Sequence, residues 1–191
     1  QMLRTAALKR RVNKLRISGA EPTIGKSHLI ALLERVEASE FGLFILETNG
    51  ILFGFDKEYV RAIARFKKPH VRVSLKAGTP EAFTRKTGAK SESFELSFRA
   101  IENLLECGVS FHVAAMSADP RIMTEVERKH LVDRLAEIDV RLALNLEEEV
   151  VDPYKTTLAR LKYAGLELDW PLKEIYAPIR AKKTDVSDKT E

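Results

Sequence analysis

Short apolar runs alternate with amphipathic helical patterns along most of this chain, at a spacing typical of βα units. Most of the runs are apolar on both faces, as in strands of a parallel sheet covered by helices. Their alternation with helices implies right-handed crossover connections. The sequence therefore predicts an α/β fold, a partial (β/α) barrel similar to a TIM barrel, with about five parallel strands and outer helices. The candidate strands are Lys14–Ser18, Leu43–Leu46, His70–Leu75, Val109–Ala114 and Val140–Leu146.

Helix-boundary chemistry supports this reading. Asp56 is a candidate N-cap, Thr79-Pro80-Glu81 opens another helix, and Gly108 is a candidate C-cap. The chain begins with a helix-like stretch, Leu3–Val12, that no candidate strand precedes. We therefore expect that the first strand of the barrel is missing and that the chain is truncated.

Length and composition indicate one domain over residues 1–176, followed by a polar tail over residues 177–191. No apolar run reaches the length of about 20 residues that spans a membrane, and no signal peptide is apparent. The single cysteine, Cys107, agrees with a reducing compartment, so we expect a cytoplasmic protein. The net charge of +4 comes partly from a basic N-terminal helix that lacks aromatic residues for base stacking. We therefore do not expect nucleic acid as a partner.

Polar residues end four of the candidate strands, in the segments 16–23, 46–50, 73–76 and 112–116. The carboxyl ends of parallel strands meet at one face of a barrel, and that face carries the binding loops. The sequence therefore predicts a single ligand site for a small molecule at this face.

The first of these segments does not fit a phosphate-binding P-loop. Five residues separate Gly19 from Gly25-Lys26-Ser27, where that motif has four. Glu21 would place a carboxylate among the phosphates, and Pro22 has no N–H group to donate. A nucleotide triphosphatase is therefore not expected.

The same loop suits a cationic ligand group, because Glu21 stands on a tight turn of small residues and can accept hydrogen bonds from an amine. Arg16-Ile17-Ser18-Gly19-Ala20-Glu21-Pro22-Thr23 resembles the Gly-Gly-Glu-Pro motif of the radical S-adenosylmethionine (SAM) superfamily. The following strand ends, Glu47-Thr48-Asn49-Gly50 and Val73-Ser74-Leu75-Lys76, are similar to those of its activating enzymes and archaeal iron-sulfur oxidoreductases. This resemblance extends over roughly Lys14 to Asn145.

The resemblance implies a set of cofactor-binding residues. Glu21 and the backbone of Gly19 and Ala20 would meet the amino group of SAM, and Lys76 would pair with a carboxylate of the cofactor or the substrate. Glu47 or Asn49, with Ser74, would lie near the ribose, and His112 and Met116 near the sulfonium or the adenine. Alternatively, Glu47 and Asn49 cap the next turn, His112 is a hydrogen-bonded interior histidine and Met116 fills the core. The full set is Ser18, Gly19, Ala20, Glu21, Pro22, Glu47, Asn49, Ser74, Lys76, His112 and Met116.

The chain also departs from the family. Ala20 replaces the second Gly of the motif, and the Cys-x3-Cys-x2-Cys motif that holds a [4Fe-4S] cluster is absent. The resemblance therefore implies a cluster in the intact protein only, where SAM would be cleaved to a 5′-deoxyadenosyl radical, and this chain alone would be inactive. Truncation explains both the missing strand and the missing cysteines.

Two other functions stay open. The chain could be a naturally cluster-free protein that binds a small molecule or regulates a partner at the same face. It could instead be an ordinary β/α-barrel enzyme, in which Glu147-Glu148-Glu149 binds Mg²⁺. The sequence does not identify the substrate.

Overall fold

The computed structural model describes residues 5, 12–150, 155–165 and 173–179. In this part of the chain five parallel strands form one open sheet in the order β1-β2-β3-β4-β5, and the predicted α/β partial barrel is confirmed. The strands are β1 (Lys14–Ile17), β2 (Leu43–Thr48), β3 (Pro69–Leu75), β4 (Phe111–Ala115) and β5 (Glu147–Glu148). The α-helices are α2 (Lys26–Glu37), α3 (Ile51–Phe55), α4 (Lys57–Ala64), α5 (Pro80–Thr87), α6 (Phe94–Glu106), α7 (Glu125–Ile138), α8 (Val140–Leu144) and α9 (Lys155–Tyr163), and two 3-10 turns are η1 (Pro22–Ile24) and η2 (Ser91–Ser93).

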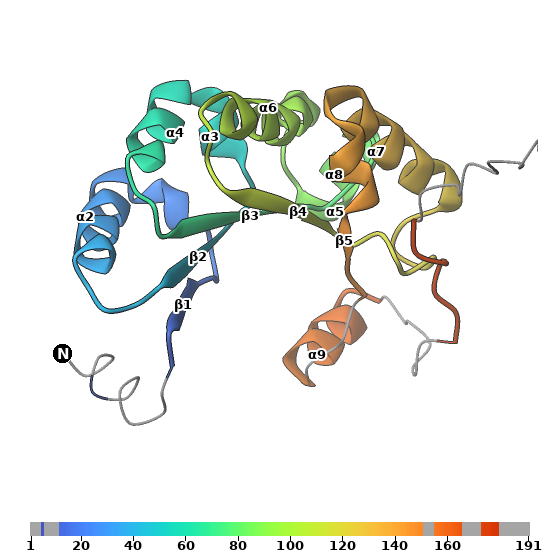
Figure 1. Cartoon of the computed structure of the whole chain (residues 1–191). Helices are drawn as coiled ribbons and strands as arrows, with labels where there is room; N and C mark the ends of the chain where they lie inside the picture. Colours follow the sequence, from blue (N-terminus) through green and yellow to red (C-terminus); the bar gives the residue numbers. More distant parts are fainter. Residues whose placement is uncertain (1–4, 6–11, 151–154, 166–172, 180–191) are drawn as a thin grey trace, which may run out of the picture.

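The two faces of the sheet differ in character. Helices α3, α4 and α6 lie over one face (Figure 1). On β3, Val71 and Val73 point to this side and are fully buried. The alternate residues His70, Arg72 and Ser74 belong to the opposite face, because side chains alternate along a strand. The hydrophobic core therefore lies under the helices, and the other face of the sheet is polar.

Close backbone packing joins α3 to α6. A Cβ atom on Gly54 would lie 1.8 Å from the carbonyl oxygen of Leu96, so only glycine fits there. The buried side chain of Asn103 donates a hydrogen bond of 2.8 Å to the Phe53 carbonyl. This contact fixes α6 against the end of β2, where the polar strand-end residues lie.

The predicted helix boundaries at Asp56 and Thr79 are confirmed. The Asp56 carboxylate accepts a hydrogen bond from the Tyr59 N–H, and Thr79 Oγ1 accepts one from the Ala82 N–H. Gly108 follows α6 with a positive φ of 65°, as expected of a glycine that ends a helix. Strand β4 begins at Phe111, two residues later than the predicted start at Val109.

The strand predicted over Val140–Leu146 is wrong. Residues Val140–Leu144 form the short helix α8, and the fifth strand is Glu147–Glu148, paired with Ala114 and Ala115. The Asp139 carboxylate caps the helix by accepting a hydrogen bond of 2.8 Å from the Arg141 N–H. Because Val140 is 58% exposed, the apolar run does not have the burial that a central strand requires.

Several other expectations concern the ends of the chain. The helix expected over Leu3–Val12 lies outside the described residues, apart from its members Thr5 and Val12. Most of the predicted tail over 177–191 also lies outside them, so that boundary stays a prediction. None of the helices in the described ranges is long and apolar enough to cross a membrane.

Candidate functional site

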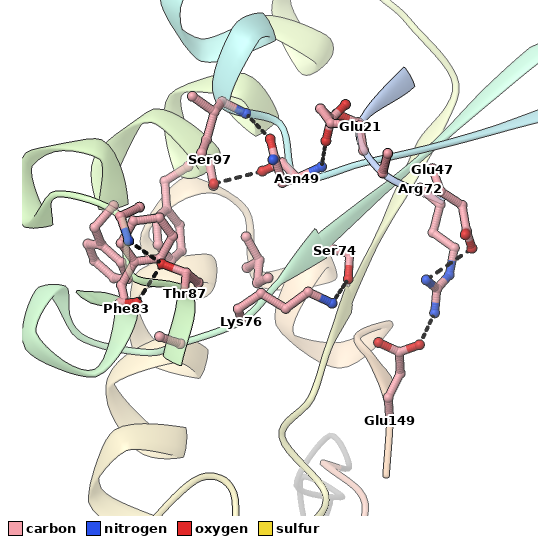
Figure 2. Close-up of a pocket in the computed structure, with 18 of the residues that line it drawn as sticks. Glu21, Glu47, Asn49, Arg72, Ser74, Lys76, Phe83, Thr87, Ser97 and Glu149 are labelled. Atoms are coloured by element: carbon pink, nitrogen blue, oxygen red, sulfur yellow. Dashed lines mark hydrogen bonds and ion pairs between the residues drawn. The ribbon is translucent and has the colours of Figure 1, made fainter. Parts of the chain in front are cut away.

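A cavity of about 560 Å³ opens at the carboxyl ends of β1, β2 and β3, between these strand ends and the helices α5 and α6 (Figure 2). This volume lies within the range of about 300–1,000 Å³ that is usual for small-molecule sites. The lining residues are Arg16, Gly19, Ala20, Glu21, Glu47, Thr48, Asn49, Ile51, Arg72, Ser74, Leu75, Lys76, Ala77, Phe83, Thr87, Ala89, Phe94, Ser97, Phe98 and Glu149.

The loop after β1 fixes one carboxylate at the cavity wall. Gly19 and Ala20 both have positive φ, 90° and 50°, and Ala20 is the one non-glycine residue in the described ranges with this geometry. Glu21 Oε1 accepts hydrogen bonds from the N–H and Oγ1 of Thr23, at 3.1 and 2.6 Å, and from Thr48 Oγ1 at 2.7 Å. Its Oε2 accepts a single bond of 2.8 Å from the Asn49 N–H. A carboxylate oxygen accepts more than one hydrogen bond, so Oε2 has acceptor capacity left for a ligand.

The polar end of β2 supports the turn that follows it. The Asn49 side-chain oxygen accepts a hydrogen bond of 2.9 Å from the Ile51 N–H, and the Asn49 carbonyl accepts one of 2.7 Å from Ser97 Oγ. Gly50 has a φ of 80°, which glycine adopts without strain. The Asn49 side chain therefore caps the turn into α3. This is the alternative role that the sequence analysis gave to Asn49.

A charged network crosses the open face of the sheet below the cavity. Arg72, whose side chain is 8% exposed, contacts Glu147 at 2.9 Å, Glu149 at 2.6 Å and Glu47 at 3.3 Å. Arg16 forms a second ion pair with Glu47. Hydrogen bonds from Arg72 and His112 lower the pKa of Glu147 to about 2, so this carboxylate is ionised at neutral pH. The side chain of Glu47 is thus occupied by two guanidinium groups.

The end of β3 presents a cation to the cavity. Lys76 Nζ donates a hydrogen bond of 2.7 Å to Ser74 Oγ, and Figure 2 shows this side chain reaching across the cavity. No carboxylate of the described residues lies within ion-pair distance of this ammonium group. Burial lowers the pKa of Lys76, the charge of Glu149 opposes this effect and the charge of Arg72 adds to it. An anionic ligand group would give this ammonium group a direct ion-pair partner.

Aromatic side chains form the wall opposite the charged strand ends. Phe83 of α5 and Phe94 of α6 meet edge to face with ring centroids 6.1 Å apart, and Phe94 meets Phe98 at 5.1 Å. Thr87 and Ala89 continue this wall beyond α5. The cavity therefore has one charged side and one apolar side.

The cavity brings together seven of the residues predicted from the sequence. They come from three strand ends and are Gly19, Ala20, Glu21, Glu47, Asn49, Ser74 and Lys76. Sequence reasoning missed the contributions of Arg16, Arg72 and the helical residues. The sequence did contain a signal for Arg72, because it alternates with the apolar Val71 and Val73 and lies two positions before Ser74, on the same face of the strand.

The other four predicted residues do not line the cavity. Ser18 is exposed after β1, and Pro22 begins η1. His112 lies on the open face, where its Nδ1 is 2.7 Å from His70 Nε2 and its Nε2 is 2.7 Å from Glu147 Oε2. Met116 follows β4, and its N–H points to the Leu75 carbonyl at 3.4 Å. His112 is hydrogen-bonded, as in the alternative, but its side chain is 32% exposed on the open face and is not interior.

The acidic run does not gather into a metal site. Glu148 points away from its neighbours and binds Arg128 at 2.8 Å, while Glu147 and Glu149 bind Arg72. Within the described ranges, no group of three or more His, Cys, Asp or Glu side chains is placed to hold a metal ion. This arrangement gives no support to the Mg²⁺ alternative.

The residues of this chain also do not fit an iron-sulfur cluster. A [4Fe-4S] cluster of the Cys-x3-Cys-x2-Cys type takes three thiolates from the protein, and Cys107 is the single cysteine of the sequence. It caps α6 and packs partly buried against the hydrophobic core, outside the cavity lining. Any cluster that acts at this cavity would need thiolates from beyond these 191 residues.

The family model for the radical SAM superfamily matches residues 1–118. The chain belongs to this superfamily. Its fold is similar to a domain of pyruvate-formate lyase-activating enzyme from Bacteroides vulgatus, with 17% identity and a TM-score of 0.54, covering 80% of this chain and 95% of that one. It is also similar to anSMEcpe, solved with bound AdoMet and a Kp18Cys peptide, with 19% identity and a TM-score of 0.55. That match covers 73% of this chain but 38% of anSMEcpe. No curated protein matches the chain in sequence.

Proposed function

We propose that this chain is the SAM-binding body of a radical SAM enzyme and that the cavity at the strand ends holds the cofactor. The observation that carries the proposal is that a carboxylate, Glu21, and an ammonium group, Lys76, line the same cavity. Glu21 offers a fixed carboxylate with free acceptor capacity, and Lys76 offers an ammonium group without a carboxylate partner in the described residues. The two line the same cavity, so they complement the amino and carboxylate groups of a methionyl ligand.

The rest of the cavity suits the rest of SAM. Ser74 Oγ lies beside Lys76 and can hydrogen-bond a ribose hydroxyl. Phe83 and Phe94, backed by the fully buried Phe98, offer an apolar surface for a flat purine ring. In this assignment Glu47 and Asn49 do not contact the cofactor directly. Glu47 is paired with Arg16 and Arg72, and the side-chain oxygen of Asn49 accepts a hydrogen bond from the Ile51 N–H.

The protein's own residues bind and orient the cofactor. In the superfamily, one-electron reductive cleavage of SAM supplies a 5′-deoxyadenosyl radical. Here Glu21 and Lys76 would anchor the methionyl end at two points, its amino group and its carboxylate. The apolar wall would exclude water from the other side.

Calorimetric titration of the 191-residue chain with SAM tests the proposal. We expect saturable binding at one site, and Glu21→Ala and Lys76→Met each weaken it by about tenfold or more, because each removes a charge-assisted hydrogen bond. Glu34→Ala, which removes an exposed carboxylate of α2 outside the cavity, serves as the matched control and retains wild-type affinity. Absence of SAM binding, or equal effects of all three variants, would contradict the proposal.

A cluster-free protein that binds or senses SAM is a second candidate, favoured by the single cysteine. The two functions differ in the natural gene. An in-frame Cys-x3-Cys-x2-Cys segment upstream of Gln1, with 5′-deoxyadenosine released anaerobically by the longer protein, supports the enzyme. A natural start at Met2 with SAM binding retained supports the cluster-free function.

A further inference from the structure

The position of Lys76 depends on the loop that follows β3. Lys76 is the first residue after the strand, and Ala77, Gly78 and Thr79 lead from it into α5. Its side chain is held in the cavity by one hydrogen bond, to Ser74. Because Lys76 belongs to this loop, a shift of the loop backbone would also move its ammonium group.

A buried carboxylate of α7 holds this loop. Glu127 Oε1 accepts a hydrogen bond of 2.9 Å from the Gly78 N–H and forms an ion pair of 2.6 Å with Lys86 Nζ. The Glu127 side chain is 6% exposed, and that of Lys86 is 17% exposed. A carboxylate so far from water is stable only with such charged and hydrogen-bonded partners.

The loop and α7 are also in direct backbone contact. A Cβ atom at Gly78 would lie 2.1 Å from the carbonyl oxygen of Glu127, so a side chain there would force the loop away from α7. Thr124 caps the first turn of α7 by accepting a hydrogen bond of 3.2 Å from the Glu127 N–H. The carboxylate therefore stands on a fixed helix end.

Glu127 contacts both ends of α5. Gly78 precedes that helix and Lys86 belongs to its last turn, while Phe83 between them lines the cavity. Glu127 itself does not line the cavity. One buried side chain outside the cavity thus contacts the chain on both sides of Phe83, including the loop that carries Lys76.

We propose that Glu127 is a positioning residue, which places the Lys76 ammonium group where it meets the carboxylate of bound SAM. The inference rests on the proposed function, and it adds a residue of α7 that acts through its contacts with both Gly78 and Lys86. A purely structural ion pair would stabilise the fold and leave ligand selectivity unchanged. The positioning role predicts that selectivity for the ligand carboxylate depends on Glu127.

Two ligands separate these roles, SAM and decarboxylated SAM, which keeps the amino group and lacks the carboxylate. The ratio of their dissociation constants measures the contribution of the carboxylate contact. In the wild-type chain we expect SAM to bind about tenfold more tightly than the decarboxylated compound. Lys76→Met should abolish this preference.

Glu127→Gln is the decisive variant, because glutamine keeps an oxygen acceptor for Gly78 and loses the charge that holds Lys86. We expect the preference for SAM to fall by about threefold or more, while the affinity for decarboxylated SAM changes little. Lys86→Met removes the other half of the ion pair and should act in the same direction. Asp119→Asn is the matched control, since Asp119 is also buried and pairs with a neighbouring arginine, outside the Lys76 loop.

Each outcome decides a separate question. If the wild-type chain binds neither compound, the proposed function fails. If it prefers SAM and both Glu127→Gln and Lys86→Met keep the full preference, only the role of Glu127 is overturned. Should Glu127→Gln not fold, as judged by circular dichroism, the Lys86→Met result decides. An equal loss for both ligands also overturns the positioning role.

Discussion

Thr48, the last residue of β2, donates a hydrogen bond of 2.7 Å from its hydroxyl group to Oε1 of Glu21, which lies 27 residues earlier in the loop after β1. The same hydroxyl oxygen accepts a bond of 3.0 Å from the Gly50 N–H. Thr48 is 3% exposed, so both bonds are shielded from water. One buried hydroxyl thus ties the candidate ligand carboxylate to the neighbouring strand end.

Thr48→Val should therefore lower both stability and ligand affinity. Valine has nearly the same shape but leaves the Gly50 N–H unsatisfied and removes one donor to Glu21, so we expect a loss of about 1–3 kcal/mol in the free energy of unfolding. SAM affinity should fall as well, because the carboxylate becomes less ordered. Urea denaturation and calorimetry measure the two effects. Thr84→Val, at an exposed position of α5, should change stability by less than about 0.5 kcal/mol.

Arg72→Met should destabilise the fold strongly. The guanidinium is almost fully buried and neutralises carboxylates from β2 and β5, so its loss leaves Glu47, Glu147 and Glu149 close together without this charge. We expect a loss of about 2–4 kcal/mol in the free energy of unfolding, because removing one partner of a buried ion pair leaves uncompensated charge. Chemical denaturation at pH 7 measures it. Arg141→Met, which breaks an exposed pair with Asp139, is the control, and a similar loss there would contradict this account.

The charged network also predicts acid sensitivity. The pKa of Glu147 falls from an ordinary value of 4.5 to about 2 in the folded chain. A depressed carboxylate pKa adds stability that is fully present above pH 4.5 and is lost as the pH falls toward 2. The stability difference between the wild-type chain and Glu147→Gln should therefore shrink over that window. Thermal melts at half-unit pH intervals measure it, and a constant difference would exclude a role for Glu147.

The sequence predicted the architecture well because alternating strands and helices leave a strong periodic signal. Residues Leu43–Leu46 and His70–Leu75 form strands because their apolar side chains can be buried in a parallel sheet covered by helices. Val140–Leu144 misled the prediction because its apolar residues alternate over one short helical turn, too few for the two periods to be distinguished. The Asp139 cap favours the helix there.

The site was predictable only in its strand-end half. Lys76 directly follows β3, Glu21 lies in the short loop after β1, and topology alone brings such strand-end positions together. Arg72 reaches the cavity from within β3, and Phe94 reaches it from α6. Whether such side chains line the cavity depends on sheet twist and helix packing, which the periodicity of the sequence does not encode. His112 lies three residues before the last alanine of β4, and its ring contacts His70 and Glu147 outside the cavity lining.

His70 and His112 should show a fixed tautomer pattern. Because ionised Glu147 only accepts, neutral His112 donates from Nε2, its Nδ1 accepts from His70 Nε2–H, and His70 Nδ1 accepts from the Ser110 hydroxyl. Burial lowers the pKa of His70, and the neighbouring His112 lowers it further. Nitrogen-15 NMR should find the Nε2–H tautomer for both rings at pH 8, and His70 should titrate below 6.5.

His112→Asn provides the comparison for this pair. Removing the neighbouring ring should move the pKa of His70 back toward 6.5, because the electrostatic effect of His112 is lost while burial remains. A lowered pKa in the folded state also means that protonation of His70 opposes folding. The free energy of unfolding should therefore decrease as the pH falls below 6.5. An unchanged titration of His70 in the variant would show that the two rings do not interact.

Gly54→Ala should disrupt the packing that holds the end of β2. The added methyl group would lie 1.8 Å from the Leu96 carbonyl oxygen, a backbone atom that cannot move without shifting α6. We expect a loss of about 3 kcal/mol in the free energy of unfolding, because overpacking of rigid backbone leaves no side chain to adjust. A shift of α6 would also move Ser97, which donates to the Asn49 carbonyl at the cavity, so SAM affinity should fall with stability. Gly25→Ala is the matched control, since its Cβ would meet nothing closer than 3.7 Å, and it should cost at most about 1 kcal/mol. If the two alanine variants unfold at the same urea concentration, the close approach of α3 and α6 does not determine the stability of this region.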